Sequence, residues 1–150
     1  MFHVGPSLIE IGRDIRISAT VLTPVGHCQF DYGRGVWDEY WCIDHSGNGA
    51  WLSVDEGDYA LERPVDSPNG QFSIGDEHQM GDYLYRAVEI DSAHCTAFRG
   101  ELPEALELGE RHDYVVFAGN SNRMATLERW PSGHSWTRGR WYSAWDIKTR

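Results

Sequence analysis

Short runs in which apolar or aromatic residues alternate with polar ones recur along the chain. The clearest run spans residues 36–44, Val-Trp-Asp-Glu-Tyr-Trp-Cys-Ile-Asp. Successive side chains of a strand point to opposite faces, so Trp37, Glu39 and Trp41 share one face of a strand here. Such runs, bounded by glycine, proline, asparagine and aspartate, are typical of antiparallel β proteins. Helical periodicity is almost absent from the sequence.

The pattern predicts an all-β or nearly all-β fold of two packed antiparallel sheets or partly open barrels. Turns are expected at 46–49 and 56–57, and residues 131–134 are expected to close a terminal hairpin. One short helical turn is predicted near Pro103–Leu108, because proline suits a first helical position and Gly109 a stop. We predict strands at residues 14–22, 28–32, 36–44, 50–55, 59–62, 71–74, 83–90, 94–102, 114–118, 124–130 and 140–147.

The length of 150 residues is that of one domain with a core of its own. We therefore predict a single β-rich domain over residues 1–150. An alternative division has two halves, 1–63 and 71–150, joined by the polar stretch 64–70. Each half would then be of a size at which a separate core is marginal.

The charge balance restricts the partners that the protein can bind. There are 23 acidic and 13 basic residues, a formal net charge of -10, which repels nucleic acids and anionic lipids. We therefore expect no nucleic-acid partner and no membrane insertion, although the sequence is compatible with a membrane-linked partner protein. The first residues lack the basic and apolar regions of a leader, and the three cysteines form no close pair, so we expect a cytoplasmic location.

Four segments of the sequence are notable for their order and spacing: 37–40, 50–54 with Gly57, 100–103 with Gly109, and 127–130 followed by Gly139. In this succession they resemble a bacterial family known as domain of unknown function 4178. This resemblance implies a β-rich fold and no established activity. Members are often encoded near polyamine-synthase-like and membrane-associated proteins, which implies an accessory role. Many members also carry an amino-terminal zinc ribbon with paired cysteines, which has no counterpart in this sequence.

The face that carries Trp37, Glu39 and Trp41 is the first candidate site, joined by Trp51 and Tyr59 from neighbouring strands. A carboxylate between indoles can hold an organic cation such as a polyamine, or a basic segment of a partner, because ring faces attract cations. The same pattern also suits core tryptophans around an acid that accepts backbone hydrogen bonds. The sequence leaves both interpretations open, and it predicts a non-catalytic binding or scaffolding module.

A small hydrolase is the competing class of function. Paired carboxylates catalyse hydrolysis when they lie about 5 to 9.5 Å apart across a cleft and one has a raised pKa. Glu39 or Glu101 would then act as general acid or base, with Glu39 facing Glu101 or Glu128 from another strand. Asp38 and Glu39 cannot form this pair on one strand, because adjacent side chains point to opposite faces.

No metal or cofactor site is predicted. The histidines and cysteines lack the spacing of a zinc site, and the glycine-rich motifs of nucleotide binding and the serine motif of hydrolases are missing. A protein partner could instead contact the tryptophan-rich terminal hairpin, because tryptophan and arginine often anchor interfaces. That predicted partner surface consists of Trp136, Arg138, Arg140, Trp141 and Trp145.

Overall fold

The computed structural model describes residues 9–55 and 57–149. Residues 1–8, on which the expectation about a leader rests, and Glu56 of the predicted turn 56–57 lie outside the described residues. The strands are β1 Ile15–Ile17, β2 Thr20–Asp31, β3 Val36–Ile43, β4 Gly49–Asp55, β5 Asp58–Val65, β6 Glu77–Met80, β7 Tyr83–Gly100, β8 Arg111–Ala118, β9 Arg123–Trp130, β10 Gly133–Tyr142 and β11 Ile147–Thr149. A single 3-10 turn over Ala144–Asp146 is the helical element of this part of the chain.

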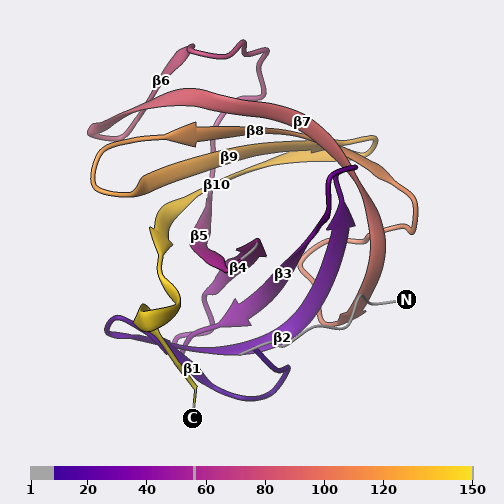
Figure 1. The fold of residues 1–150 in the computed structure, drawn as a ribbon, viewed down its shortest axis with the longest axis vertical. Coiled ribbons are helices and arrows are strands. Elements are labelled where there is room, and N and C mark those ends of the chain that lie inside the picture. Colours follow the sequence, from indigo (N-terminus) through magenta and orange to yellow (C-terminus); the bar gives the residue numbers. More distant parts are fainter. Residues whose placement is uncertain (1–8, 56, 150) are drawn as a thin grey trace.

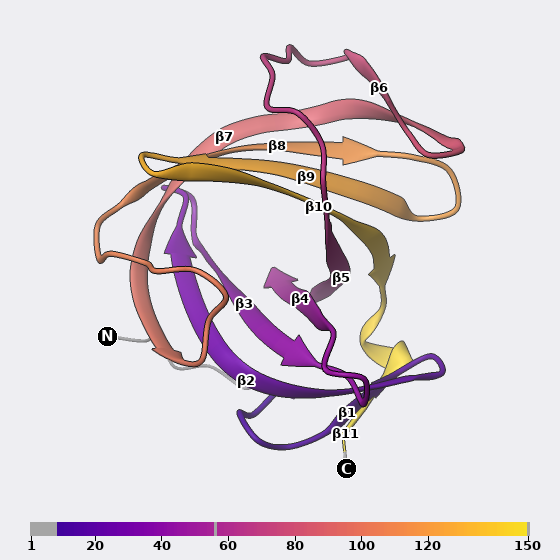
Figure 2. The same ribbon diagram turned by 180° about the vertical axis from the view of Figure 1, so that it is seen from behind.

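Eight of the strands form a closed antiparallel barrel in the order β2-β3-β4-β5-β10-β9-β8-β7, with β7 pairing back onto β2. Figure 1 shows β7 to β10 as one wall and β2 to β5 as the other, with the long β7 curving from the first wall to the second. The second seam joins β5 to β10, and Figure 2 shows β10 bending away from β9 to reach it. Closure leaves the barrel strands without free edges.

Apolar side chains pack on both surfaces of the barrel wall. One cluster lies inside, around Phe30, Cys95 and Tyr114. A second lies outside β8, β9 and β10, where Phe117 and Trp136 are covered by Phe72 from the segment between β5 and β6. The third lies outside the opposite wall, beneath β1 and β11. Because both outer surfaces are covered, the barrel interior does not have to supply the whole core.

The predicted all-β class is confirmed, and the main differences concern strand length. We predicted breaks between residues 22 and 28 and between 90 and 94, but β2 and β7 run through both places. A bulge between Pro24 and Gly26 lets β2 continue past a proline, and a bulge between Ala87 and Glu89 bends β7. Bulges cannot be recognised from residue type alone, so β2 and β7 were each predicted as two strands.

Four local predictions were wrong. The predicted strand 14–22 is divided into β1 and β2 by a turn at Ser18 and Ala19. Residues 71–74 are not a strand, and Phe72 in this segment packs onto the barrel from outside. Pro103–Leu108 forms bends instead of a helical turn, because Leu106 packs against the interior cluster. The predicted strand 140–147 is interrupted by the 3-10 turn. At the start of this turn, the Asp146 side chain accepts hydrogen bonds from the backbone amide and the hydroxyl of Ser143. The hairpin closed by residues 131–134 is present between β9 and β10.

Among the described residues, no helix has both the length and the apolar character needed to cross a membrane.

Candidate functional site: an acidic, aromatic cavity inside the barrel

A cavity of about 120 Å³ lies inside the barrel. Strands β3 to β5 and β7 to β10 all contribute to it through alternate residues, because every second side chain of a barrel strand points inward. Trp37 and Glu39 on β3 illustrate the alternation. The cavity is lined by Tyr32, Trp37, Glu39, Trp51, Ser53, Asp55, Ala60, Glu62, Glu89, Tyr114, Val116, Met124, Thr126, Glu128, Ser135, Thr137 and Trp141.

The lining is strongly acidic. Its carboxyl groups belong to Glu39, Asp55, Glu62, Glu89 and Glu128, and no lysine or arginine is among the described residues that line the cavity. Carboxylates gathered in an enclosed space repel one another, because the low local dielectric screens charge poorly. The arrangement therefore favours either bound protons or a positively charged guest.

Glu62 lies deepest among these acids and is only 5 % exposed. Its two carboxyl oxygens accept hydrogen bonds from Thr126 Oγ1, at 3.2 Å, and from Thr137 Oγ1. Burial raises the pKa of Glu62 to about 7, helped by the charge of Glu128 and opposed by the two threonine hydrogen bonds. Both hydrogen-bond partners of this buried acid are neutral hydroxyls, and among the described residues no ion pair joins Glu62 to a cation.

Glu39 faces the same space and is half-buried, with its remaining exposed surface on the cavity. Burial is the largest cause that raises the pKa of Glu39 well above its ordinary value, followed by the charges of Glu128 and Glu62. A hydrogen bond with the Trp37 side chain acts in the opposite direction. A cationic guest beside Glu39 would favour its carboxylate form and so oppose this rise in pKa.

His112 bridges two acids, Glu128 and Glu110. The imidazole is buried at 2 % exposure, with Nδ1 2.8 Å from Glu128 and Nε2 2.9 Å from Glu110. Burial lowers the pKa of His112, but the hydrogen bonds and charges of Glu128 and Glu110 outweigh it, and the net pKa is raised. An imidazolium can donate from both nitrogens at once, whereas a neutral ring can donate from only one.

Glu104 adds a further acid next to this group, from the loop between β7 and β8. Burial raises the pKa of Glu104 to about 7, and the charge of Glu128 adds to this effect, while that of His112 opposes it. In the same loop, Leu106 packs against the interior cluster. The loop thus brings one more titratable group close to the barrel acids.

Aromatic rings form the rest of the wall. Trp37 stacks on Phe30 at 5.3 Å between ring centroids and meets Tyr114 edge-on, also at 5.3 Å. Trp51 on β4 lies directly opposite Trp41 on β3, and their ring centroids are 5.1 Å apart. These contacts fix the indoles of Trp37 and Trp51 as rigid surfaces of the cavity.

A cation of the chain lies beside Glu89, one of the acids that line the cavity. Arg34, in the turn between β2 and β3, places Nη1 3.1 Å from Asp91 and Nη2 3.9 Å from Glu89 on β7. Its guanidinium also lies over the Tyr32 ring, 5.0 Å from the centroid. Acidic and aromatic groups of this barrel thus hold a positively charged group from the chain itself.

Three of the five residues predicted for a cation site line the cavity, namely Trp37, Glu39 and Trp51. Trp41 packs against Trp51 on the same face. Tyr59 requires a correction, because it is buried at 7 % exposure in the cluster outside the barrel. Its neighbours Ala60 and Glu62 face inward in its place.

Glu101 does not lie with Glu39. Glu101 is exposed in the loop that follows β7, where its backbone amide bonds to Val25, and it is not among the cavity residues. Glu128 does line the cavity with Glu39. Of the two carboxylate partners considered for Glu39, only Glu128 shares its site.

The five residues predicted as a partner surface do not form one surface. Trp136 is 2 % exposed, stacks on His78 and donates Nε1 to the Pro68 carbonyl, so it belongs to the outer core. Arg138 lies beside it on the outer side and bonds to the Met80 carbonyl. Arg140, Trp141 and Trp145 instead line a separate cleft.

Sequence reasoning missed Glu62, His112 and the threonines that bind Glu62. The hydrogen bonds of Glu62 join residues 64 and 75 positions apart, across strands whose pairing the sequence does not reveal. The alternation of residues along each strand could have indicated these positions, because Glu62 and Glu128 both lie on strands whose alternate residues face inward.

Within residues 9–55 and 57–149, no group of three or more histidine, cysteine or acidic side chains is arranged to hold a metal ion. Cys28, Cys42 and Cys95 are free thiols.

A family model described as domain of unknown function (DUF4178) matches residues 10–144, which include every strand of the barrel. The chain belongs to the DUF4178 family. Comparisons with the curated proteins and with the solved structures found no match. The DUF4178 match therefore covers the whole cavity without assigning a chemistry to it, and a function has to be argued from the cavity itself.

Proposed function

We propose that the barrel is a binding module for a small organic cation, held as a protonated amine inside the cavity. The observation that carries the proposal is the lining, which combines Glu39 and Glu62 with the indoles of Trp37 and Trp51 and contains no lysine or arginine among the described residues. Carboxylates and indole faces are the groups that recognise ammonium ions in proteins.

The dimensions favour a short aminoalkyl group. The cavity volume of about 120 Å³ is close to that of four water molecules at roughly 30 Å³ each. One ammonium group with a few methylenes fits this space, and a longer chain would have to extend past Glu89 toward solvent. An indole face contributes about 0.5 to 2 kcal/mol, and a charge-assisted hydrogen bond about 1.5 to 3 kcal/mol. Micromolar to millimolar affinity is expected.

Binding of an amine should release protons. Burial raises the pKa of Glu62 to about 7 and that of Glu39 well above its ordinary value. A cation favours the carboxylate form of both groups, so each proton displaced makes the affinity depend on pH. Affinity should therefore increase between pH 6 and pH 8 for an amine that stays protonated over this range.

The test is calorimetric titration with 1,4-diaminobutane and with butylamine, with 1-butanol as the uncharged comparison. Both amines are expected to bind and the alcohol is not. Glu39→Gln and Glu62→Gln should each weaken amine binding about tenfold or more, because each removes a charged acceptor while keeping the side-chain shape. Glu77→Gln is the matched control, since this exposed residue of β6 lies outside the cavity.

Two results would overturn the proposal. One is the absence of heat for either amine at millimolar concentration with the protein shown to be folded. The other is equal weakening by Glu77→Gln, which would mean that overall negative charge attracts the amine rather than the cavity. Buffers of different ionisation enthalpy separate proton release from the heat of binding.

A small hydrolase is the second candidate, favoured by the raised pKa of Glu39 beside the carboxylate of Glu128. A general acid of a glycosidase needs such a pKa, and aromatic walls suit a sugar ring. Release of nitrophenol from aryl glycosides, abolished by Glu39→Gln, would support this function. A folded protein without turnover that binds amines would exclude it in favour of the binding module.

A further inference from the structure

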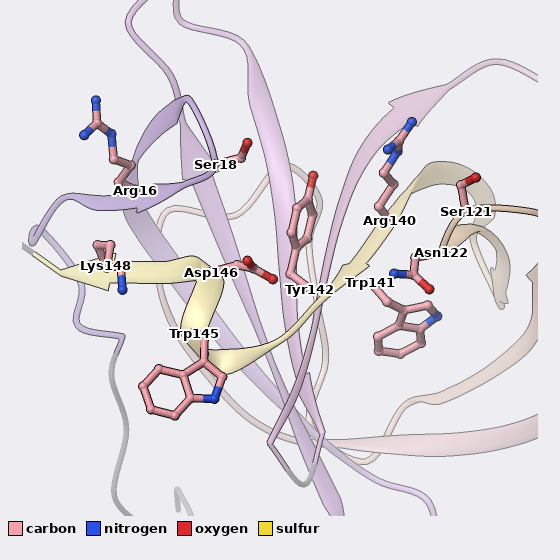
Figure 3. Close-up of a pocket in the computed structure, with 10 residues that line it drawn as sticks. All are labelled: Arg16, Ser18, Ser121, Asn122, Arg140, Trp141, Tyr142, Trp145, Asp146 and Lys148. Atoms are coloured by element: carbon pink, nitrogen blue, oxygen red, sulfur yellow. The ribbon is translucent and has the colours of Figure 1, made fainter.

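A second concave site lies outside the barrel, near the carboxyl-terminal end of the chain. It is a cleft of about 540 Å³ that forms where β1 and β11, the end of β10 and the turn between β8 and β9 meet. Figure 3 shows Arg16 and Lys148 on one side of the cleft, Arg140 on the other and Tyr142 between them. The volume lies within the range of about 300 to 1,000 Å³ that small-molecule sites occupy.

Three cationic side chains line this cleft in a protein whose net charge is -10. Arg16 and Lys148 occupy directly opposite positions of β1 and β11. Opposite residues of an antiparallel pair share a face, and like charges in this arrangement repel each other and destabilise the pair. The strands thus hold an unfavourable charge pair that an anion between the two side chains would relieve.

Carboxylates of the described residues form no ion pair with this group. Within the described part of the chain, no ion pair is found for Arg16, Arg140 or Lys148. Asp146 also lines the cleft, but its Oδ2 accepts hydrogen bonds from the backbone amide and the hydroxyl of Ser143. The positive charges are therefore available to a ligand.

Neutral donors complete the lining. Ser18, Ser121 and Asn122 are the residues other than glycine with positive φ in the described chain, at 56°, 58° and 62°, and all three line the cleft. Glycine would adopt these conformations without strain, whereas a residue with a Cβ atom is strained in them. Hydroxyl and amide groups are thus kept in two turns, close to the three cations.

Trp145 gives the cleft an aromatic surface. It follows β10 in the 3-10 turn and is 84 % exposed, more than any other large apolar side chain that the structure describes. Figure 3 shows its indole extending from the turn beside the cleft. An exposed indole next to arginines suits a ligand that carries an apolar or ring portion together with its charge.

We infer that this cleft binds the phosphate group of an anionic ligand, at a site separate from the cation cavity. Arginine forks and hydroxyl donors match phosphate oxygens, and a phosphate carries enough charge to bridge Arg16 and Lys148. The inference does not depend on the function proposed for the barrel, although Trp141 lines both sites. The phosphate can belong to a soluble compound or to a lipid headgroup.

The experiment titrates the protein with sodium pyrophosphate and, in a second arm, with vesicles of phosphatidylglycerol against vesicles of phosphatidylcholine. Nitrogen-proton NMR spectra follow the indole signal of Trp145, assigned by its loss in Trp145→Phe. Pyrophosphate is expected to shift this signal, and Arg16→Gln, Arg140→Gln and Lys148→Gln should each weaken binding about tenfold. Arg86→Gln is the charge-matched control on the exposed face of β7.

Unfolding temperatures keep the test interpretable. Lys148→Gln removes the like-charge pair, so without ligand its unfolding temperature should equal or exceed that of the parent protein, and pyrophosphate should no longer raise it. Binding to phosphatidylglycerol vesicles but not to pyrophosphate would assign the phosphate to a lipid headgroup. Binding to neither, or equal weakening by Arg86→Gln, overturns the inference.

Discussion

Inside the barrel, Nδ1 of His112 lies 2.8 Å from a carboxyl oxygen of Glu128. The other ring nitrogen is 2.9 Å from Glu110, so the imidazolium form satisfies two acids at once. This pairing divides the acids of the cavity into two kinds. Glu128 is paired with an imidazole whose pKa is raised, whereas the partners of Glu62 are two threonine hydroxyls. A cationic guest therefore gains most beside Glu62 and Glu39.

Glu128→Gln is expected to lower the pKa of His112, because the largest favourable interactions of the imidazolium come from Glu128. The His112 pKa is raised in the folded protein, so its stabilising effect is full below the unfolded value near 6.5 and is lost as pH rises through the folded pKa. The variant should lose about 1 to 3 kcal/mol of unfolding free energy at pH 5.5 and less at pH 8.5. Proton NMR of the imidazole and urea unfolding at both pH values measure these effects.

The control for this prediction is Glu107→Gln, an exposed acid of the loop that also carries Glu104 and Glu110. It should leave the titration of His112 nearly unchanged. An unchanged His112 titration in Glu128→Gln would show that the hydrogen bond to Glu128 does not hold the proton on the ring.

Without a ligand, the protein should be more stable at pH 5 than at pH 8. Burial raises the Glu62 pKa from its ordinary 4.5 to about 7, so the folded state binds more protons than the unfolded state between these values. Stability then decreases as pH rises through this window, by about 3 kcal/mol for Glu62 alone. His112 and Glu104, whose pKa values are also raised, act in the same direction.

Glu62→Gln removes the Glu62 part of this dependence. The amide stays uncharged at every pH and can still accept a hydrogen bond from Thr137, so the variant should be more stable than the parent at pH 8 and similar to it at pH 5. Urea unfolding at the two pH values, with Glu77→Gln as control, measures the difference. If Glu62→Gln changed the unfolding free energy equally at both pH values, this would contradict a raised pKa of Glu62.

Alternation along single strands was enough to predict part of the site. Trp37 and Glu39 share a face by their spacing alone, and Trp51 joins them because β4 follows β3 through a short turn. The prediction that Tyr59 belongs to the site was wrong, because closure of the barrel determines which face of β5 points inward. That face carries Ala60 and Glu62.

Long-range pairing was beyond the sequence pattern. The seam between β5 and β10 places Glu62 next to Gly139 and within reach of Thr137, although about half the chain separates them. Trp136 was predicted to belong to a partner surface because tryptophan often anchors interfaces, but the outer face of its strand is covered by Phe72. Coverage of an outer face by a loop leaves no periodic signal.

Gly139→Ala should disrupt the β5–β10 seam. A Cβ atom at Gly139 would lie 1.7 Å from the Leu61 carbonyl oxygen, which is backbone and cannot move without shifting the strand. Several kcal/mol of unfolding free energy should be lost, whereas a tolerated surface substitution changes it by about 0.5 kcal/mol or less. Gly35→Ala is the control, because the nearest atom to its added Cβ is 3.6 Å away. Guanidinium unfolding compares the two, and similar values for both would show that the seam can relax.

Arg34→Gln should strengthen amine binding, in contrast to the cavity variants. The guanidinium lies 3.1 Å from Asp91 and 3.9 Å from Glu89, and Glu89 lines the cavity. Removing this charge makes the outer end of the cavity more negative, so an entering amine loses a competitor and meets less repulsion. We expect a two- to fivefold gain in affinity at low salt, decreasing toward none near 0.5 M salt because mobile ions screen exposed charges.

Calorimetric titration with 1,4-diaminobutane at both salt concentrations measures the gain, with Arg86→Gln as the charge-matched control. Weaker binding by Arg34→Gln would mean that Arg34 orders the acids at the outer end instead of competing for them.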